Sequence, residues 1–158
     1  MVGIKADIKL NKKVVERLEV LAYRKGVTIG YSSEKEHDSG PGLAEVARIQ
    51  EFGTKTIPPR PFIRPTLDSF KKIWAAKVVK GLKRHKTDSG VVTVWGDVGK
   101  SIVRCLRTAI DKVNDPPLSV KTIARRRKKG NYSIKPLVDT GTMRDELAYQ
   151  VTGEEWKK

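Results

Sequence analysis

The chain of 158 residues has very few of the residue types that build metal and cofactor sites. It contains one cysteine, Cys105, and two histidines, His37 and His85. A single cysteine excludes an internal disulfide and a cysteine-based metal cluster, and a structural zinc site needs four nitrogen or sulfur ligands. We therefore expect no metal and no cofactor. Cys105 falls beside the apolar face of a predicted helix, which favours a small buried hydrophobic residue over a nucleophile.

Long hydrophobic runs and enzyme motifs are absent as well. No stretch approaches the roughly 20 apolar residues that a membrane helix needs, and the first residues lack the apolar core of a secretory signal. No glycine-rich phosphate loop follows a predicted strand, and both histidines sit in polar segments, away from any Ser/His/Asp arrangement. We expect neither membrane contact nor enzymatic activity.

Acidic residues are scarce relative to basic ones. The 33 lysines and arginines exceed the 18 acidic residues, so the formal net charge is +15. Such a charge favours a polyanionic or acidic partner, which can be a nucleic acid, an anionic membrane face or an acidic protein. The length is that of one domain, which we assign to residues 1–158.

Hydrophobic spacing predicts an α+β fold. We expect a single domain in which a small antiparallel sheet of two to four strands packs with three or four helices, beside an extended proline-rich arm. A sheet with so few strands has unpaired edges that can pair with a neighbouring chain, so we expect an oligomer. Helices are predicted at 14–22, 43–52, from Thr66 or Asp68 to 82, at 95–113 and, shorter, at 120–129 and 143–147; strands are predicted at 27–31 and 148–152, and 91–94 is either a strand or an extended lead-in.

The stretch from Glu51 to Asp68, EFGTKTIPPRPFIRPTLD, is the most distinctive part of the chain. Four of the eight prolines fall between Pro58 and Pro65. Each proline fixes φ and removes a backbone donor, so the stretch should be neither helix nor inner strand. It is predicted to be a stiff extended arm at residues 54–65 that carries apolar and arginine side chains and is therefore suited to docking.

Two further patterns could carry chemistry. The run Arg125, Arg126, Arg127, Lys128 and Lys129 could contact a polyanion, although five adjacent cations point all round a helix. Solvated or helix-end charge is the favoured interpretation for this run, and polyanion contact stays open.

The triplet Asp139-Thr140-Gly141 resembles the active-site strand of retroviral-type aspartic proteases. It comes too near the end of the chain to leave room for the flap and sheet of such an enzyme. We favour a turn in which Asp139 or Thr140 caps the next helix and Gly141 supplies an unusual φ.

Four segments in order resemble one family. They are LAEVARIQEFGT (43–54), IPPRPFIRPT (57–66), PLSVKTIA (117–124) and KPLVDTGTM (135–143). Together they resemble the tail-completion or neck proteins of long-tailed bacteriophages, the virion-morphogenesis group that includes the lambda minor tail protein Z. Met143 stands where that group usually has leucine, and Asp145-Glu146 replaces a commoner small polar pair.

The resemblance implies a non-enzymatic structural part of the virion, made in the host bacterial cytoplasm. Such proteins form ring-shaped adaptors that complete the tail and allow head and tail to join. The partners implied are further copies of the chain in a hexameric or dodecameric ring, and neighbouring neck, connector, tail-tube or tail-terminator proteins, with incidental contact to packaged DNA. The alternative is a small basic nucleic-acid-binding protein that uses the Arg125–Lys129 helix.

Under the family interpretation the proline-rich arm docks on a neighbouring subunit. Phe62 is then the anchor in a pocket, and Arg60 and Arg64 pair with carboxylates at its rim. Docking of the arm on its own domain is the alternative. The predicted partner-binding residues are Phe52, Arg60, Phe62, Ile63 and Arg64.

Overall fold

The computed structural model describes residues 25–32, 42–85 and 87–158, and the structural statements below concern these residues. Within them the chain forms five helices and a three-stranded antiparallel sheet, which confirms the predicted α+β class. The helix predicted at 14–22 lies outside the described residues. In chain order the elements are β1 (Val27–Gly30), α2 (Leu43–Phe52), α3 (Ile63–Arg84), α4 (Asp88–Lys112), α5 (Val120–Lys128), α6 (Thr142–Asp145), β2 (Ala148–Val151) and β3 (Trp156–Lys157).

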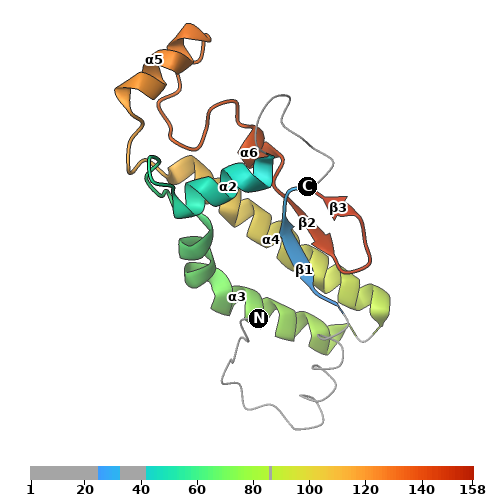
Figure 1. The fold of residues 1–158 in the computed structure, drawn as a ribbon. Coiled ribbons are helices and arrows are strands. Elements are labelled where there is room, and N and C mark those ends of the chain that lie inside the picture. Colours follow the sequence, from blue (N-terminus) through green and yellow to red (C-terminus); the bar gives the residue numbers. More distant parts are fainter. Residues whose placement is uncertain (1–24, 33–41, 86) are drawn as a thin grey trace.

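The sheet joins the two ends of the described chain. The central strand β2 pairs antiparallel with β1, so that Val27 lies opposite Val151, and on its other edge with β3. α4 crosses one face of this sheet, and α3 packs against α4, so the layers are sheet, α4 and α3 (Figure 1). The strands predicted at 27–31 and 148–152 are confirmed, because their β-branched and aromatic residues suit a half-buried pleated surface.

α4 is the helix around which the core forms. Thr87 caps it, since its Oγ1 accepts a hydrogen bond from the backbone N–H of Gly90 at 3.2 Å. The prediction that 91–94 is a strand or extended lead-in is wrong, because this cap starts the helix at Asp88 and carries the valines into it. The buried residues of the helix are Val91, Val94, Val98, Gly99, Ser101, Ile102, Val103, Leu106 and Ile110.

α3 begins earlier than predicted, at Ile63 rather than at Thr66 or Asp68. Pro65 lies in the first turn of the helix. A proline is tolerated there because the N–H groups of the first turn have no partner within the helix. The expectation that the proline-rich stretch is not helical is therefore wrong at both of its ends, since Glu51 and Phe52 belong to α2 and residues 63–68 to α3, whereas residues 53–62 are irregular.

α5 stands apart from the rest of the fold at the end of a long excursion of the chain (Figure 1). It follows the predicted boundaries closely. Ser119 caps the helix, since its Oγ accepts a hydrogen bond from the N–H of Thr122 at 3.2 Å. The chain then returns to the body and enters α6 and β2.

None of the helices in the described ranges is long and apolar enough to cross a membrane. The main core lies between α4, the sheet and the start of α3, and Ile110 and Phe62 are among its most deeply buried side chains. Cys105 is partly buried and packs against this core, in agreement with its interpretation as a small hydrophobic residue.

Candidate partner-binding site

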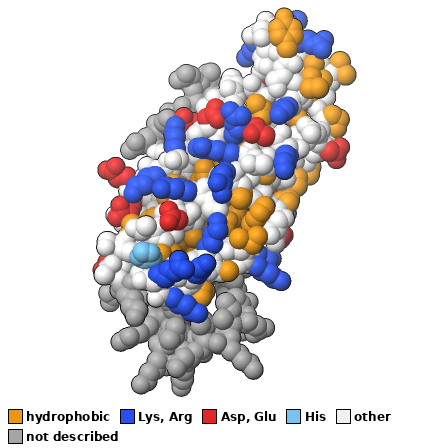
Figure 2. Space-filling model, turned by 180° about the vertical axis from the view of Figure 1, so that it is seen from behind, with side chains coloured by type: hydrophobic (Ala, Val, Ile, Leu, Met, Phe, Trp, Pro, Cys, Tyr) orange, Lys and Arg blue, Asp and Glu red, His pale blue; other side chains and the backbone are white. Residues whose placement is uncertain are grey.

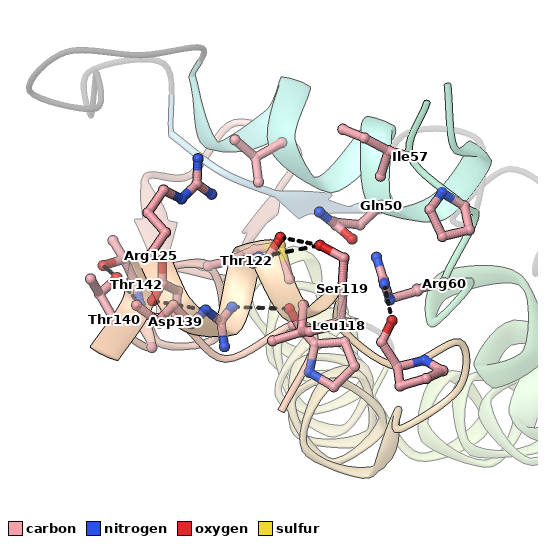
Figure 3. Close-up of a pocket in the computed structure, with 18 of the residues that line it drawn as sticks. Gln50, Ile57, Arg60, Leu118, Ser119, Thr122, Arg125, Asp139, Thr140 and Thr142 are labelled. Carbon is pink, nitrogen blue, oxygen red and sulfur yellow. Dashed lines mark hydrogen bonds and ion pairs between the residues drawn. The ribbon is translucent and has the colours of Figure 1, made fainter. Parts of the chain in front are cut away.

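A pocket of about 610 Å³ opens between α2, the proline segment (residues 54–62, which connect Gly53 to α3) and the chain around α5 (Figure 3). All four segments that resemble phage neck proteins contribute to its lining. Gln50 comes from α2, Ile57 from the proline segment, Thr122 from α5 and Thr140 from the segment before α6. Sequence positions that lie far apart therefore meet at one site.

Glu51, the neighbour of the pocket-lining residue Gln50, anchors the start of α3. Its side chain is 1% exposed. One carboxylate oxygen, Oε2, accepts hydrogen bonds from the backbone N–H groups of Phe62 and Ile63, both at 2.8 Å. The other, Oε1, accepts from the backbone N–H and the Nε of Arg64, both at 3.0 Å. A carboxylate from α2 thus satisfies the free donors at the N-terminus of α3.

These contacts determine the charge state of Glu51. Burial by itself raises the pKa of the carboxyl group, but the hydrogen bonds from Ile63, Arg64 and Phe62 outweigh burial and hold the pKa below its ordinary value. Glu51 is therefore ionised at neutral pH and stabilises the positive end of the α3 dipole.

The proline segment folds back along the end of α2. Gly53 has φ 73°, and a Cβ there would lie 2.8 Å from the carbonyl oxygen of Ile57, so the turn requires glycine. Thr54 closes the turn, since its Oγ1 accepts a hydrogen bond from the N–H of Ile57 at 3.0 Å. The N–H of Arg60 then donates to the carbonyl of Gln50 at 2.6 Å.

Arg60 connects the proline segment to the chain that leads into α5. Its Nε donates to the carbonyl oxygen of Pro116 at 2.7 Å, and its Nη2 donates to that of Pro117 at 2.9 Å (Figure 3). Burial and the nearby positive charge of Arg126 lower the pKa of the Arg60 guanidinium below its ordinary value. One side of the pocket is therefore held by bonds within the chain.

Arg126 also binds backbone carbonyl groups, on the opposite side of the pocket from Arg60. Its guanidinium is buried and donates to four backbone carbonyl groups of the returning chain. Its Nε lies 3.1 Å from Oδ1 of Asp139, close enough for an ion pair although not aligned as a hydrogen bond. The carbonyl oxygens belong to Ser133, Lys135, Pro136 and Val138, at 2.8–3.3 Å.

The predicted partner-binding residues divide into two groups. Phe62 is 1% exposed and lies in the chain's own core, and Arg60 is 5% exposed. The prediction that these two dock on a neighbouring subunit is corrected, because their side chains are already bound within the chain. Ile63 is half-buried against the same core. Phe52 is exposed, and the Arg64 guanidinium lies 4.8 Å from the centre of its ring. The Arg64 side chain is 57% exposed, but its Nε and Nη2 already donate to Glu51 of the same chain.

The predicted polyanion-binding residues also divide. Arg126 is 6% exposed and holds backbone carbonyls, so its assignment to a polyanion surface is corrected. The exposed cations of this run are Arg125, Arg127, Lys128 and Lys129.

Sequence reasoning missed Glu51 and Gln50. A signal for Glu51 is present, because Leu43, Ala47 and Glu51 follow one another at intervals of four residues and therefore share the buried face of α2. A carboxylate on a buried helical face needs partners, and the nearest candidates in sequence are donors in the proline-rich stretch. Gln50 carries no comparable signal.

The Asp139-Thr140-Gly141 triplet forms a turn, as expected. Gly141 has φ 86°, as expected, and occupies the N-cap position of α6, while the Oγ1 of Thr140 accepts a hydrogen bond from the N–H of Thr142, the first residue of that helix, at 3.4 Å. Asp139 instead accepts a hydrogen bond from the side chain of Asn131 at 2.6 Å, in addition to its ion pair with Arg126.

Comparison of the chain with protein-family models, curated proteins and solved structures found no match.

Proposed function

We propose that the chain is a structural component of a bacteriophage virion, a ring-forming adaptor of the neck or tail end that completes the tail and allows head and tail to join. The single observation that carries this proposal is the meeting of the four neck-protein-like segments around one pocket. If these segments resembled the family by chance, nothing would require them to converge in space. The protein acts as a structural part rather than as an enzyme.

Exposed apolar side chains supply a surface for ring formation. Phe52, at the end of α2, is 60% exposed and Ile73 is 51% exposed. On α3, Leu67 and Phe70 precede Ile73 at intervals of three residues and are exposed as well. On the face turned away from the sheet, hydrophobic side chains gather among lysines and arginines (Figure 2). Adjoining exposed apolar residues of this kind mark protein–protein contacts. We propose that this α3 surface (Phe52, Leu67, Phe70 and Ile73) contacts the neighbouring subunit.

Light scattering and negative-stain imaging of the purified protein, alone and mixed with tail tubes, test the proposal. We expect discrete rings or ring-capped tubes. Ile73→Glu should remain folded but lose assembly, because it places a charge in the apolar contact. Lys72→Glu, which adds a carboxylate on the same helix and keeps the apolar surface, is the matched control. A strict monomer that never joins tubes or heads would overturn the adaptor function.

A second candidate function is nucleic-acid binding through α5. One observation favours it: residues 116–138 contain seven lysines and arginines and no acidic residue. Four of these cations are the exposed side chains of the 125–129 run. Fluorescence anisotropy with random-sequence duplex DNA distinguishes the two functions. A DNA-binding protein loses affinity steeply with salt, by a slope of about 0.9 per neutralised phosphate, whereas an adaptor binds DNA weakly.

A further inference from the structure

The pocket between α2 and α5 has the lining of a peptide-binding site. Its volume of about 610 Å³ lies within the range of sites that enclose a ligand, roughly 300–1,000 Å³. Leu43, Ile57 and Leu137 are among its aliphatic lining residues. Among the described residues no aromatic side chain lines the pocket, so it offers no platform on which a nucleobase could stack.

Gln50 presents an unused acceptor in this lining. Its side-chain oxygen, Oε1, is buried and has no hydrogen-bond partner among the described residues. The Gln50 amide points into the space between α2 and α5 (Figure 3). A buried acceptor without a donor costs about 1–3 kcal/mol. A ligand that supplies an N–H group at this position recovers that free energy, and the backbone of an extended peptide carries such groups regularly.

Arg125 presents an unused cation at the same pocket. Three guanidinium groups line the site, but those of Arg60 and Arg126 are bound to backbone carbonyls and, for Arg126, to Asp139. The Arg125 guanidinium has no ion pair or hydrogen bond among the described residues, and it reaches from α5 toward α2 across the pocket from Gln50 (Figure 3). An exposed guanidinium beside an apolar cavity is suited to a carboxylate, which it can bind through two parallel hydrogen bonds.

We infer that this pocket binds an extended acidic segment of a partner protein. An aliphatic side chain of the segment lies against Leu43, Ile57 and Leu137, a backbone N–H donates to Oε1 of Gln50, and a carboxylate pairs with Arg125. The inference rests on the proposed function in one respect, namely that the chain has protein neighbours in the assembled particle. It specifies the chemistry by which one of those neighbours is recognised.

Charge indicates that the segment comes from a different protein. The chain carries a formal net charge of +15, so a second copy approaches this pocket against its own positive field. An acidic partner is attracted by the same field, which also raises the rate of association. The neighbouring copies of a ring are assigned to the separate α3 surface.

A peptide array tests the inference on the purified chain. Peptides of about eight residues, in a Gly/Ser background, carry one leucine and one glutamate at every relative spacing, and a matched array carries lysine in place of glutamate. We expect binding to the glutamate array at a restricted set of spacings. For the peptides that bind, ¹⁵N-resolved NMR should report shifts of the Gln50 side-chain amide.

Two charge-reversal variants separate the pocket from general electrostatic attraction. Arg125→Glu should weaken peptide binding by at least about tenfold, since it replaces the carboxylate's partner by a like charge. Arg127→Glu changes the charge equally on the same helix but lies outside the pocket lining, and should change affinity by less than about twofold. Both positions are exposed, so neither change should disturb the fold.

Several results would overturn the inference. They are the absence of binding to the glutamate array, equal binding to the lysine array, an equal loss of affinity in the Arg127→Glu variant, and displacement of bound peptide by short oligothymidylate at equal affinity. None of these measurements depends on ring formation. Failure of the peptide site is therefore distinguishable from failure of the adaptor function, which is read from assembly with tail tubes.

Discussion

Replacing Glu51 tests the structural basis of the site most directly. In Glu51→Ala the N–H groups of Phe62, Ile63 and Arg64 lose their acceptor. The N–H of Phe62 is buried, so water does not replace the carboxylate there. A buried donor left without a partner costs about 1–3 kcal/mol, and the N–H groups of Ile63 and Arg64 are partly buried beside that of Phe62. We expect Glu51→Ala to lower the free energy of unfolding by about 3–5 kcal/mol.

Glu51→Gln gives a graded version of the same change. The carboxylate uses one oxygen for Phe62 and Ile63 and the other for Arg64. An amide has only one oxygen, so it retains one pair of bonds and turns its NH₂ toward the donors of the other pair. We expect a loss of about 2–3 kcal/mol, between the wild type and Glu51→Ala.

The pH dependence supplies an independent measurement. The folded-state pKa of Glu51 lies below the ordinary value of 4.5, so its stabilising effect is complete above that value and is lost as the pH falls through the folded-state pKa. The unfolding free energy of the wild type should therefore fall in acid more steeply than that of Glu51→Gln. Parallel curves for the two proteins would contradict the assigned role of the carboxylate.

Chemical denaturation followed by tryptophan fluorescence measures these changes, since Trp74 is buried in the core. Glu45→Gln is the matched control, because Glu45 is an ionised residue of the same helix whose bonds to Arg48 are exposed. It should leave stability nearly unchanged. If Glu45→Gln and Glu51→Gln had the same effect, general loss of charge rather than the capping of α3 would be the cause.

Three further changes have expected outcomes that follow from packing. Phe62→Ala should lower the unfolding free energy by about 3–5 kcal/mol in thermal or chemical denaturation, since the ring is in the core; a stable, folded variant would return Phe62 to an interface role. Gly99→Ala places a Cβ 2.5 Å from Cδ2 of Tyr149 and should cost about 1–3 kcal/mol by the same measurement, and no loss would mean that α4 and β2 pack less closely. Arg126→Met should lower the unfolding free energy by about 1–3 kcal/mol and speed amide hydrogen exchange in residues 133–139, because their carbonyls lose a shared buried donor; unchanged exchange would contradict that role.

The sequence predictions are correct where an element is fixed by residues close together in the chain, and wrong where it depends on a residue of another element. The ranges predicted for α5 and α2 agree with the structure because both helices have local boundaries: Ser119 caps α5 through Thr122, three residues away, and Gly53 follows the last residue of α2 directly. The prediction that α3 begins after Pro65 places its start too late, because a proline can occupy the first turn of a helix. The acceptor that allows the helix to begin at Ile63 lies on a different helix, at Glu51.

The sequence by itself determined the α+β class, the β1 and β2 strands, the restricted backbone of the four closely spaced prolines and the excess of positive charge. These properties depend on periodicity, backbone restriction and composition, which act between near neighbours in the chain. Only the tertiary structure decided which side chains of the proline-rich stretch are available to a partner. Phe62 entered the core and Arg60 found the carbonyls of Pro116 and Pro117, more than fifty residues away, while Phe52 and Arg64 stayed accessible. The sequence shows that an arginine requires hydrogen-bond acceptors and that a phenylalanine favours burial. Which groups fulfil these requirements depends on the distant segments that the fold brings into contact with them.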